Sequence, residues 1–311
     1  MKKTVSLFTI LTLFVAAAVA QNHVFRILAT KGDNKVQQGS AWTSMSTGSK
    51  VYKGNKVQIT EGGYAGLMHK SGKTIELKTP GTFDITELEA KLSTKSTTFA
   101  EKYAKFALND LNGDDEYKTN YNVTGTVVRG DSDAEFIANS EMTLIKNVPI
   151  TLSWIEGKQG VVFSDDMEIR LINLFDEVVY RAPVTEKNYI SLNIPDNIKT
   201  EGKLLLTLYD NKISKDLTVD SRIKVAVEGK DSPVAAEYEK LTKELSIDSP
   251  MDNLVLASFF EENKMSNYAL SSLNKAHILA PDVSDFEDTF VNYMITSEIV
   301  DAEIVKKVIK K

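Results

Sequence analysis

Two kinds of hydrophobic periodicity divide the chain. Up to about residue 230, apart from the stretch Leu92–Leu111, the apolar residues stand in short runs that alternate with polar ones, and Gly-, Ser- and Asn-rich turns separate the runs. After Ser232 the apolar residues recur every three or four positions instead. Alternation is typical of strands, and the longer period is typical of amphipathic helices. The sequence therefore predicts a multidomain α+β chain with an N-terminal all-β domain, a central β-sandwich and a C-terminal α-helical domain.

Residues 21–90 predict a small all-β domain built of hairpins. In "EGGYAGLMHKSGKTIELKTPGTFDI" glycine turns separate short strands whose apolar residues alternate: Ala65 and Leu67, Ile75 and Leu77, then Phe83 and Ile85. Such punctuation by Gly-Gly and Ser-Gly is typical of hairpin connections. The segment resembles the FecR-type β domain of bacterial envelope proteins over about 60 residues. The resemblance implies a periplasmic or surface β module, and it implies no activity.

Residues 91–120 predict a connecting helix and turn. In the stretch Leu92–Leu111, Phe99, Tyr103 and Phe106 recur at helical intervals behind Ser and Thr residues that are good caps. We expect this helix to pack on the first β domain or to bridge to the next one.

Residues 121–230 predict an antiparallel sandwich. Six strand-like segments follow one another: "NVTGTVVRG", "VPITLSWIEG", "GVVFSDDMEIRLINLFDEVVYRAPV", "NYISLNIP", "GKLLLTLYDN" and "SRIKVAV". Polar and apolar residues alternate cleanly around Trp154, and turns come at short, regular spacing. The pattern resembles an immunoglobulin-like or fibronectin-III domain without a cysteine pair. The segment "EGKDSPV" is the expected linker to the helical end.

Residues 231–311 predict a helical domain. The expected helices are Val234–Leu245, Met251–Asn263, Asn267–Ala280, Asp285–Ile295 and Ile299–Ile309. Ser249 is the expected N-cap of the second helix, with Pro250 at its first position. Ser266 and Ser284 are the expected N-caps of the next two helices.

The second and third of these helices resemble a tetratricopeptide repeat. The matching residues are Leu256, Ala257, Phe260, Ala269, Leu273, Ala276 and Pro281, whereas Asn253 stands where the family usually has Trp. Small residues allow two antiparallel helices to approach closely, and the larger residues fill the holes beside them. The resemblance implies a short helical end of one or two repeats. That end could dock a segment of another protein, or it could fold and close the end of the sandwich.

Residues 1–20 predict a secretory signal peptide. Lys2 and Lys3 precede an apolar run that ends in small residues, and cleavage is expected after Ala20. An uncleaved membrane anchor is the alternative, and no later stretch is apolar enough to span a bilayer. The chain contains no cysteine, so disulfides and thiolate metal sites are excluded. We expect an exported bacterial protein in the periplasm, or else released or associated with the outer membrane.

Charge argues against nucleic acid as a partner. The formal net charge of the whole chain is −6, and from Ser232 onward eight lysines and no arginine stand against fourteen acidic residues. An acidic surface repels the phosphate backbone.

No catalytic, cofactor-binding or metal-binding constellation is recognisable. His23, His69 and His277 lie in three separate segments, without partners at metal-ligand spacing. The acidic turn Asp110–Glu116 could hold calcium, but its glycine comes too early for an EF-hand loop, so a solvated turn is the simpler interpretation. The tripeptide Arg129–Asp131 is an adhesion motif in animal-matrix ligands, but chance or use in a β-turn is the simpler interpretation here, and the sequon at Asn122 would be used only in a eukaryotic secretory route. Ser93–Ser96 is capping sequence.

These observations predict a non-enzymatic protein of the cell envelope that works by protein-protein interaction, as a scaffold or accessory subunit. The expected partner is an envelope protein that meets the helical C-terminal domain. The alternative is a glycan- or peptidoglycan-binding protein in which Trp42, Tyr52 and Tyr64 of the first β domain form a stacking face, although core packing is also open for these rings.

Overall fold

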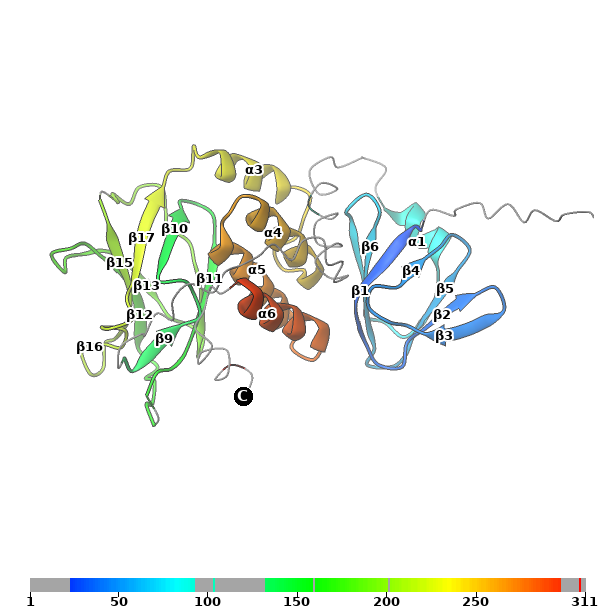
Figure 1. The fold of residues 1–311 in the computed structure, drawn as a ribbon, viewed down its shortest axis with the longest axis horizontal. Coiled ribbons are helices and arrows are strands. Elements are labelled where there is room, and N and C mark those ends of the chain that lie inside the picture. The colour runs from blue at the N-terminus through cyan, green and yellow to red at the C-terminus, as the bar shows by residue number, and fades with distance from the viewer. Residues whose placement is uncertain are drawn as a thin grey trace, which may run out of the picture.

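The computed structural model describes residues 23–92, 103, 132–158, 160–200, 202–297 and 308. Within them the chain is mixed α+β, with strands in the N-terminal and central parts and helices at the C-terminal end, as predicted. Figure 1 shows that the helices, although last in the sequence, lie between the two β parts. The order of the parts in space therefore differs from their order along the chain.

The N-terminal β part contains two four-stranded antiparallel sheets, with strand orders β4-β1-β6-β7 and β3-β2-β5-β8. Their strands are β1 (Phe25–Lys31), β2 (Lys35–Gln38), β3 (Ala41–Ser44), β4 (Lys50–Val51), β5 (Lys56–Ile59), β6 (Tyr64–His69), β7 (Thr74–Leu77) and β8 (Gly81–Asp84). Residues from both sheets, among them Phe25, Ile27, Val57 and Leu67, form a separate hydrophobic core. Gly72 takes a positive φ of 84° at the turn between β6 and β7, where glycine is favoured because it has no Cβ.

The prediction that Ile85 closes the last strand is wrong, because this residue begins helix α1 (Ile85–Lys91). The carboxylate of Asp84 accepts the backbone N–H of Thr86, which caps the helix and stops β8 one residue earlier. Leu92 already has extended backbone. Of the rest of the predicted connecting helix only Tyr103 lies within the described residues. It is helical and fully buried, with its ring edge against Phe259.

The central β part contains a six-stranded and a three-stranded sheet. The larger has the order β10-β17-β15-β12-β13, with β16 also paired to β15, and the smaller has the order β14-β11-β9. The strands are β9 (Ala134–Phe136), β10 (Glu141–Ile145), β11 (Ile150–Glu156), β12 (Met167–Ile172), β13 (Val178–Pro183), β14 (Tyr189–Leu192), β15 (Leu204–Asp210), β16 (Lys215–Asp216) and β17 (Ile223–Glu228). All described pairs are antiparallel except β10 with β17. The predicted segment "NVTGTVVRG" lies outside the described residues, and β9, β10 and β16 were not predicted.

Strand β11 is buried on both faces. Leu152 and Trp154 belong to the hydrophobic core, and the ring of Trp154 makes an edge contact with Phe136. Thr151 and Ser153 alternate with them and would normally face water, yet both are buried as well. Helix α5 (Ser266–Leu279) covers this second face. The polar half of the alternating pattern therefore marks a contact with a helix.

The other helices are α3 (Pro233–Leu241), α4 (Pro250–Glu262) and α6 (Ser284–Ser297). Ser249 caps α4 as predicted, since its hydroxyl accepts the N–H of Asp252 at 3.1 Å. The prediction for Ser266 is wrong: Met265 is the N-cap of α5, and no side chain there makes a capping hydrogen bond. Ser284 is the first residue of α6. The last predicted helix lies outside the described residues except for Val308.

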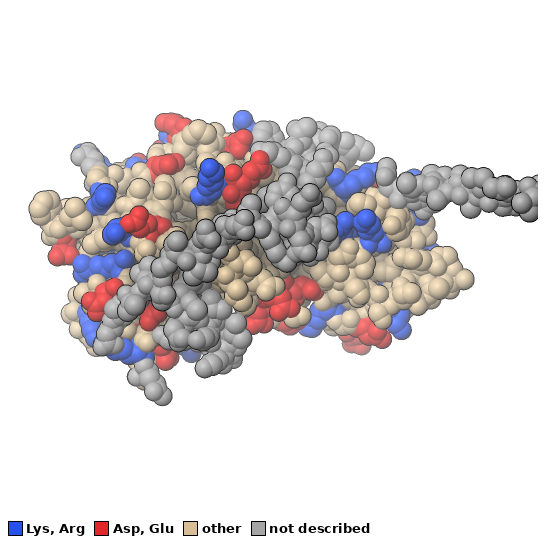
Figure 2. Space-filling model, viewed as in Figure 1, with Lys and Arg blue, Asp and Glu red and all other residues tan. Residues whose placement is uncertain are grey.

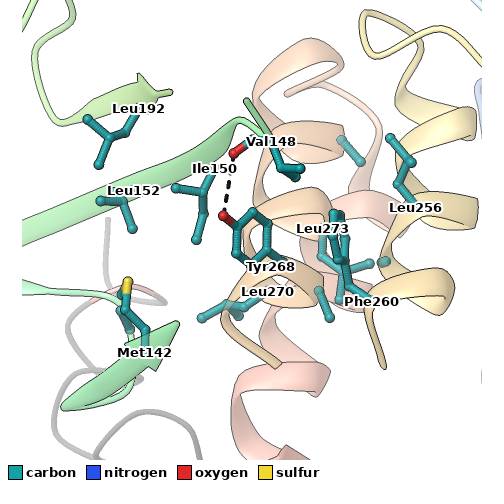
Figure 3. Packing of buried hydrophobic residues seen from close by; sticks show 14 of the residues in the cluster. Met142, Val148, Ile150, Leu152, Leu192, Leu256, Phe260, Tyr268, Leu270 and Leu273 are labelled. Carbon is teal, nitrogen blue, oxygen red and sulfur yellow. Dashed lines mark hydrogen bonds between the residues drawn. The ribbon is translucent and has the colours of Figure 1, made fainter. Parts of the chain in front are cut away.

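Helix α4 is buried all around, from Pro250 to Phe260, which is the pattern of a helix in the centre of a layer. Ala257 of α4 and Ala269 and Ala276 of α5 are buried. Figure 3 shows Leu273 of α5 on the side that faces Phe260 of α4.

One continuous hydrophobic cluster joins the central β part, the helices and one face of the N-terminal β part. It includes Trp154, Phe259 and Phe286, and it extends to Tyr64 and Met68 of β6. The ring of Tyr64 makes an edge contact with that of Phe286 at 5.9 Å. The C-terminal helices therefore connect the two β parts through a shared core.

Candidate functional site

A hollow lies where strand β10 meets the turn between α4 and α5 and the start of α5. It has a volume of about 350 Å³, at the lower end of the range for ligand pockets. Residues from β10, β17, the start of β15 and the α4–α5 turn line it. The polar and charged members of this lining are Asn139, Glu141, Thr143, Lys203, Lys224, Lys264, Ser266 and Asn267.

Strand β10 is an edge strand, and its register shows which backbone groups face away from the sheet. At the two ends of the parallel ladder, the N–H of Lys224 donates to the carbonyl of Ser140 at 2.9 Å, and the N–H of Lys146 donates to the carbonyl of Glu228 at 3.0 Å. Alternate residues of a strand bond to the same neighbour. Even-numbered residues of β10 therefore bond to β17, and the odd-numbered ones face the open edge.

Helix α5 covers both ends of this edge and leaves the middle open. Asn267 donates its side-chain amide to the carbonyl of Glu141 at 3.2 Å, and the N–H of Ile145 donates to the hydroxyl of Tyr268 at 2.8 Å. Between them, the backbone N–H and C=O of Thr143 have no hydrogen-bond partner among the described residues, and Thr143 lines the hollow. Exposed unpaired strand edges readily accept another strand.

The side chains around the hollow carry a positive balance. Lys203, Lys224 and Lys264 stand against the single carboxylate of Glu141. The hydrogen bond from Lys224 to Glu141, at 2.9 Å, and the charge of Lys224 lower the pKa of the glutamate. The chain as a whole has a negative net charge, whereas the charged residues that line the hollow have a positive balance.

No sequence signal pointed to this site. The three lysines come from segments that are twenty to forty residues apart, and nothing in their local context separates them from other surface lysines. The open edge of β10 depends on the parallel pairing with β17, which lies about eighty residues further along the chain.

A second polar cluster joins the N-terminal β part to α4. The carboxylate of Asp252 accepts the N–H of Ser246 at 2.8 Å and the hydroxyl of Thr74. The hydroxyl of Ser249 donates to Glu76 at 2.6 Å. Burial raises the pKa of Asp252, and the nearby charge of Glu76 acts in the same direction.

Acidic residues at the start of α6 extend this interface. Asp285 accepts the backbone N–H of Thr30 at 2.8 Å and the hydroxyl of Thr47 at 2.9 Å, and Lys31 pairs with Asp282 at 2.7 Å. Figure 2 shows acidic side chains gathered near α6, beside the N-terminal β part. These groups fix the position of the two parts relative to each other.

The histidines do not form a metal site. His69 is buried, its Nδ1 lies 2.7 Å from the hydroxyl of Ser71, and its Nε2 lies 3.6 Å from Glu89. Burial lowers the pKa of both His69 and His23. His277 of α5 stacks on Phe290, whereas His23 and His69 belong to the N-terminal β part. Among the described residues no group of three or more His, Cys, Asp or Glu side chains is arranged so that it could hold a metal ion.

The three aromatic residues of the predicted stacking face are not equivalent. Tyr64 is buried against α6, so its ring is not available to a sugar. Trp42 lies in the other sheet, on β3, and is 40 % exposed. Tyr52 is half-buried. The calcium candidate Asp110–Glu116, the tripeptide Arg129–Asp131, Asn122 and Ser93–Ser96 lie outside the described residues.

Helix α5 leaves no room for a partner on the face that touches β11. The hydroxyl of Ser271 accepts the N–H of Thr151 at 2.6 Å, and Asn274 donates to the hydroxyl of Ser153 at 2.5 Å. Figure 3 shows Tyr268 pointing from α5 toward the same strand, with its hydroxyl joined to the carbonyl of Val148. This face of α5 is therefore fully occupied by contacts with the central β part.

No protein-family model matches this sequence, and no curated protein is significantly similar to it. The resemblances to FecR-type, immunoglobulin-like and tetratricopeptide domains therefore stay predictions. No helix in the described part of the chain is long and apolar enough to cross a bilayer.

Proposed function

We propose that this chain is an exported, non-enzymatic interaction protein of the bacterial cell envelope, acting as a scaffold or accessory subunit. In this proposal residues 1–20 are the secretory signal, residues 21–90 a FecR-type β domain and residues 121–230 an immunoglobulin-like sandwich. Residues 231–311 form a tetratricopeptide-like end. The enclosed Trp154 and the buried alanines of α4 and α5 support the last two assignments.

The observation that carries the proposal is the hollow beside Thr143, with its open strand edge and three lysines. It is a concave surface that combines unpaired backbone groups with charge, and such surfaces recognise extended protein segments. Residues Lys264–Tyr268, at the end of the α4–α5 turn and the start of α5, line the hollow, so it adjoins the helical end. In this proposal the partner still binds at the helical end, but not on the face of α5 that contacts β11.

Site-specific photo-crosslinking in the native cells tests the proposal. A photoreactive residue at position 143 is expected to give one dominant adduct with an envelope protein. The same residue at position 175 serves as control, because Phe175 is 84 % exposed on a distant hairpin tip. Equal adducts at both positions, or none at position 143, would contradict the proposal.

A glycan-binding function is the second candidate, and the exposure of Trp42 favours it. All four residues of β3 are exposed, so the indole is accessible on an edge strand. Aromatic rings of this kind stack on sugar faces. The mature chain should then sediment with cell-wall sacculi. Trp42→Ala should abolish sedimentation and Trp42→Phe should retain part of it, whereas equal sedimentation of all three would remove this candidate.

A further inference from the structure

We infer that the hollow binds a short, extended, acidic segment of a partner protein, which adds itself as a strand to the open edge of β10. The inference rests on the proposed function and specifies the chemistry of the partner at the same site. Three features of the hollow support it: the unpaired backbone, the charge and the length of the opening.

The unpaired backbone of Thr143 requires a partner with its own backbone donor and acceptor. A small anion could meet the N–H but would leave the C=O without a donor. An extended peptide offers both groups at the spacing of a strand ladder. Burying these two groups without partners would be costly, so a bound segment that excludes water is expected to pair with them.

The charge of the lining selects an acidic segment. Lys203 and Lys264 have no ion-pair partner among the described residues. Lys224 pairs with Glu141, which also lines the hollow. A carboxylate that enters the hollow meets an excess of ammonium groups, and a basic segment meets repulsion. Because the lysines are exposed, we expect salt to weaken the interaction.

The opening on the edge is short. Asn267 occupies the carbonyl of Glu141, and Tyr268 occupies the N–H of Ile145. A strand rises about 3.3 Å per residue, so the free stretch around Thr143 admits roughly three residues of an added strand. The bound segment is therefore a short extended stretch held at its centre, and its flanks leave the sheet beside α5.

Binding of synthetic peptides to the full chain tests this inference. The probe is a fluorescent peptide of sequence Thr-Glu-Val-Glu-Thr, and the matched peptide carries Lys in place of Glu. Two further versions are N-methylated, one at Val and one at the following Glu. Alternate N–H groups of a strand face the same neighbour, so only one of the two methylations should weaken binding, by about tenfold or more.

Variants of the chain provide the second measurement. The N–H of Thr143 faces the open edge, a position at which a strand tolerates proline. Thr143→Pro should therefore reduce affinity about tenfold, and Thr143→Val, which keeps the N–H, should reduce it less than Thr143→Pro does. Lys203→Glu combined with Lys264→Glu should reverse the preference between the acidic and basic peptides. Circular dichroism shows whether each variant folds.

The outcomes separate the inference from the proposed function. Strand addition would be overturned if both N-methylated peptides bind as tightly as the unmethylated peptide and the Thr143→Pro variant binds as tightly as the wild type. The acidic preference would be overturned if the basic peptide binds as tightly as the acidic one. If no peptide binds although position 143 crosslinks to a protein in cells, the inference fails and the proposed function stands. The N-methylated peptides need no altered protein, so the test holds even if a variant does not fold.

Discussion

Replacement of Asp252 by asparagine should remove a pH dependence of stability without breaking the contact between α4 and the N-terminal β part. Asp252 is 8 % exposed and accepts hydrogen bonds from Ser246 and Thr74. Asparagine has the same shape. Its amide oxygen can accept the N–H of Ser246, and its NH₂ group can donate to the hydroxyl of Thr74, which rotates freely.

The sign of the effect follows from the direction of the pKa shift. Burial raises the pKa of Asp252 above its ordinary value of 3.8, so the folded chain binds this proton more tightly than the unfolded chain. The stability that this group contributes is complete below its ordinary pKa, and it is lost as the pH rises through the folded pKa. Asparagine does not titrate. As the pH rises, the free energy of unfolding of Asp252→Asn should therefore increase relative to that of the wild type.

The hydrogen bonds set the magnitude. Asp252→Asn keeps both and should change the free energy of unfolding by less than about 1 kcal/mol at neutral pH, whereas Asp252→Ala leaves both partners unpaired and should cost about 2–4 kcal/mol. Urea unfolding from about pH 4 to about pH 7 measures both effects.

Asp248→Asn is the matched control, because its side chain is 81 % exposed in the same turn. Hydrogen exchange at the N–H of Ser246 reports the local contact. Two results would show that the role given to Asp252 is wrong. One is a wild type that becomes more stable relative to Asp252→Asn as the pH rises, and the other is a loss of unfolding free energy in Asp252→Asn as large as that in Asp252→Ala.

Two other contacts give further predictions. Tyr268→Phe leaves the buried N–H of Ile145 without its acceptor and should cost about 1–3 kcal/mol in urea unfolding, with faster hydrogen exchange at that amide; an unchanged exchange rate would refute it. Gly157→Ala should cost about 1–3 kcal/mol, because a Cβ there would overlap the backbone carbonyl of Ser132. Gly229→Ala meets open space and should be nearly neutral, so equal losses in both variants would contradict the steric argument.

Local signals predicted several elements closely because they act within one turn of chain. Helix α4 was expected at Met251–Asn263 and is found at Pro250–Glu262, since Ser249 and Pro250 fix its start. The error at Ser266 has a local cause too. The N–H groups of Tyr268 and Ala269 both donate to the carbonyl of Met265, which makes Met265 the cap residue.

The contacts between distant segments could not be predicted from one sequence. Alternation in β11 indicated that Thr151 and Ser153 share a face, but it carried no information about what covers that face. The open edge at Thr143 has the same origin, because it exists only after β17 pairs with one side of β10 and α5 covers the ends of the other. Periodicity shows which residues share a face of a strand or helix. Which element packs on that face depends on contacts between segments that are far apart in the sequence.

The two interfaces of the helical layer differ in chemistry. Toward the central β part the helices use neutral groups, among them Tyr268, Ser271 and Asn274. Toward the N-terminal β part they use carboxylates, Asp252 and Asp285. Protonation of Asp252 changes its contact with the N-terminal β part. Acid therefore acts on the joint between the N-terminal β part and the helices through Asp252, whereas the contacts of Tyr268, Ser271 and Asn274 with the central β part involve no carboxylate.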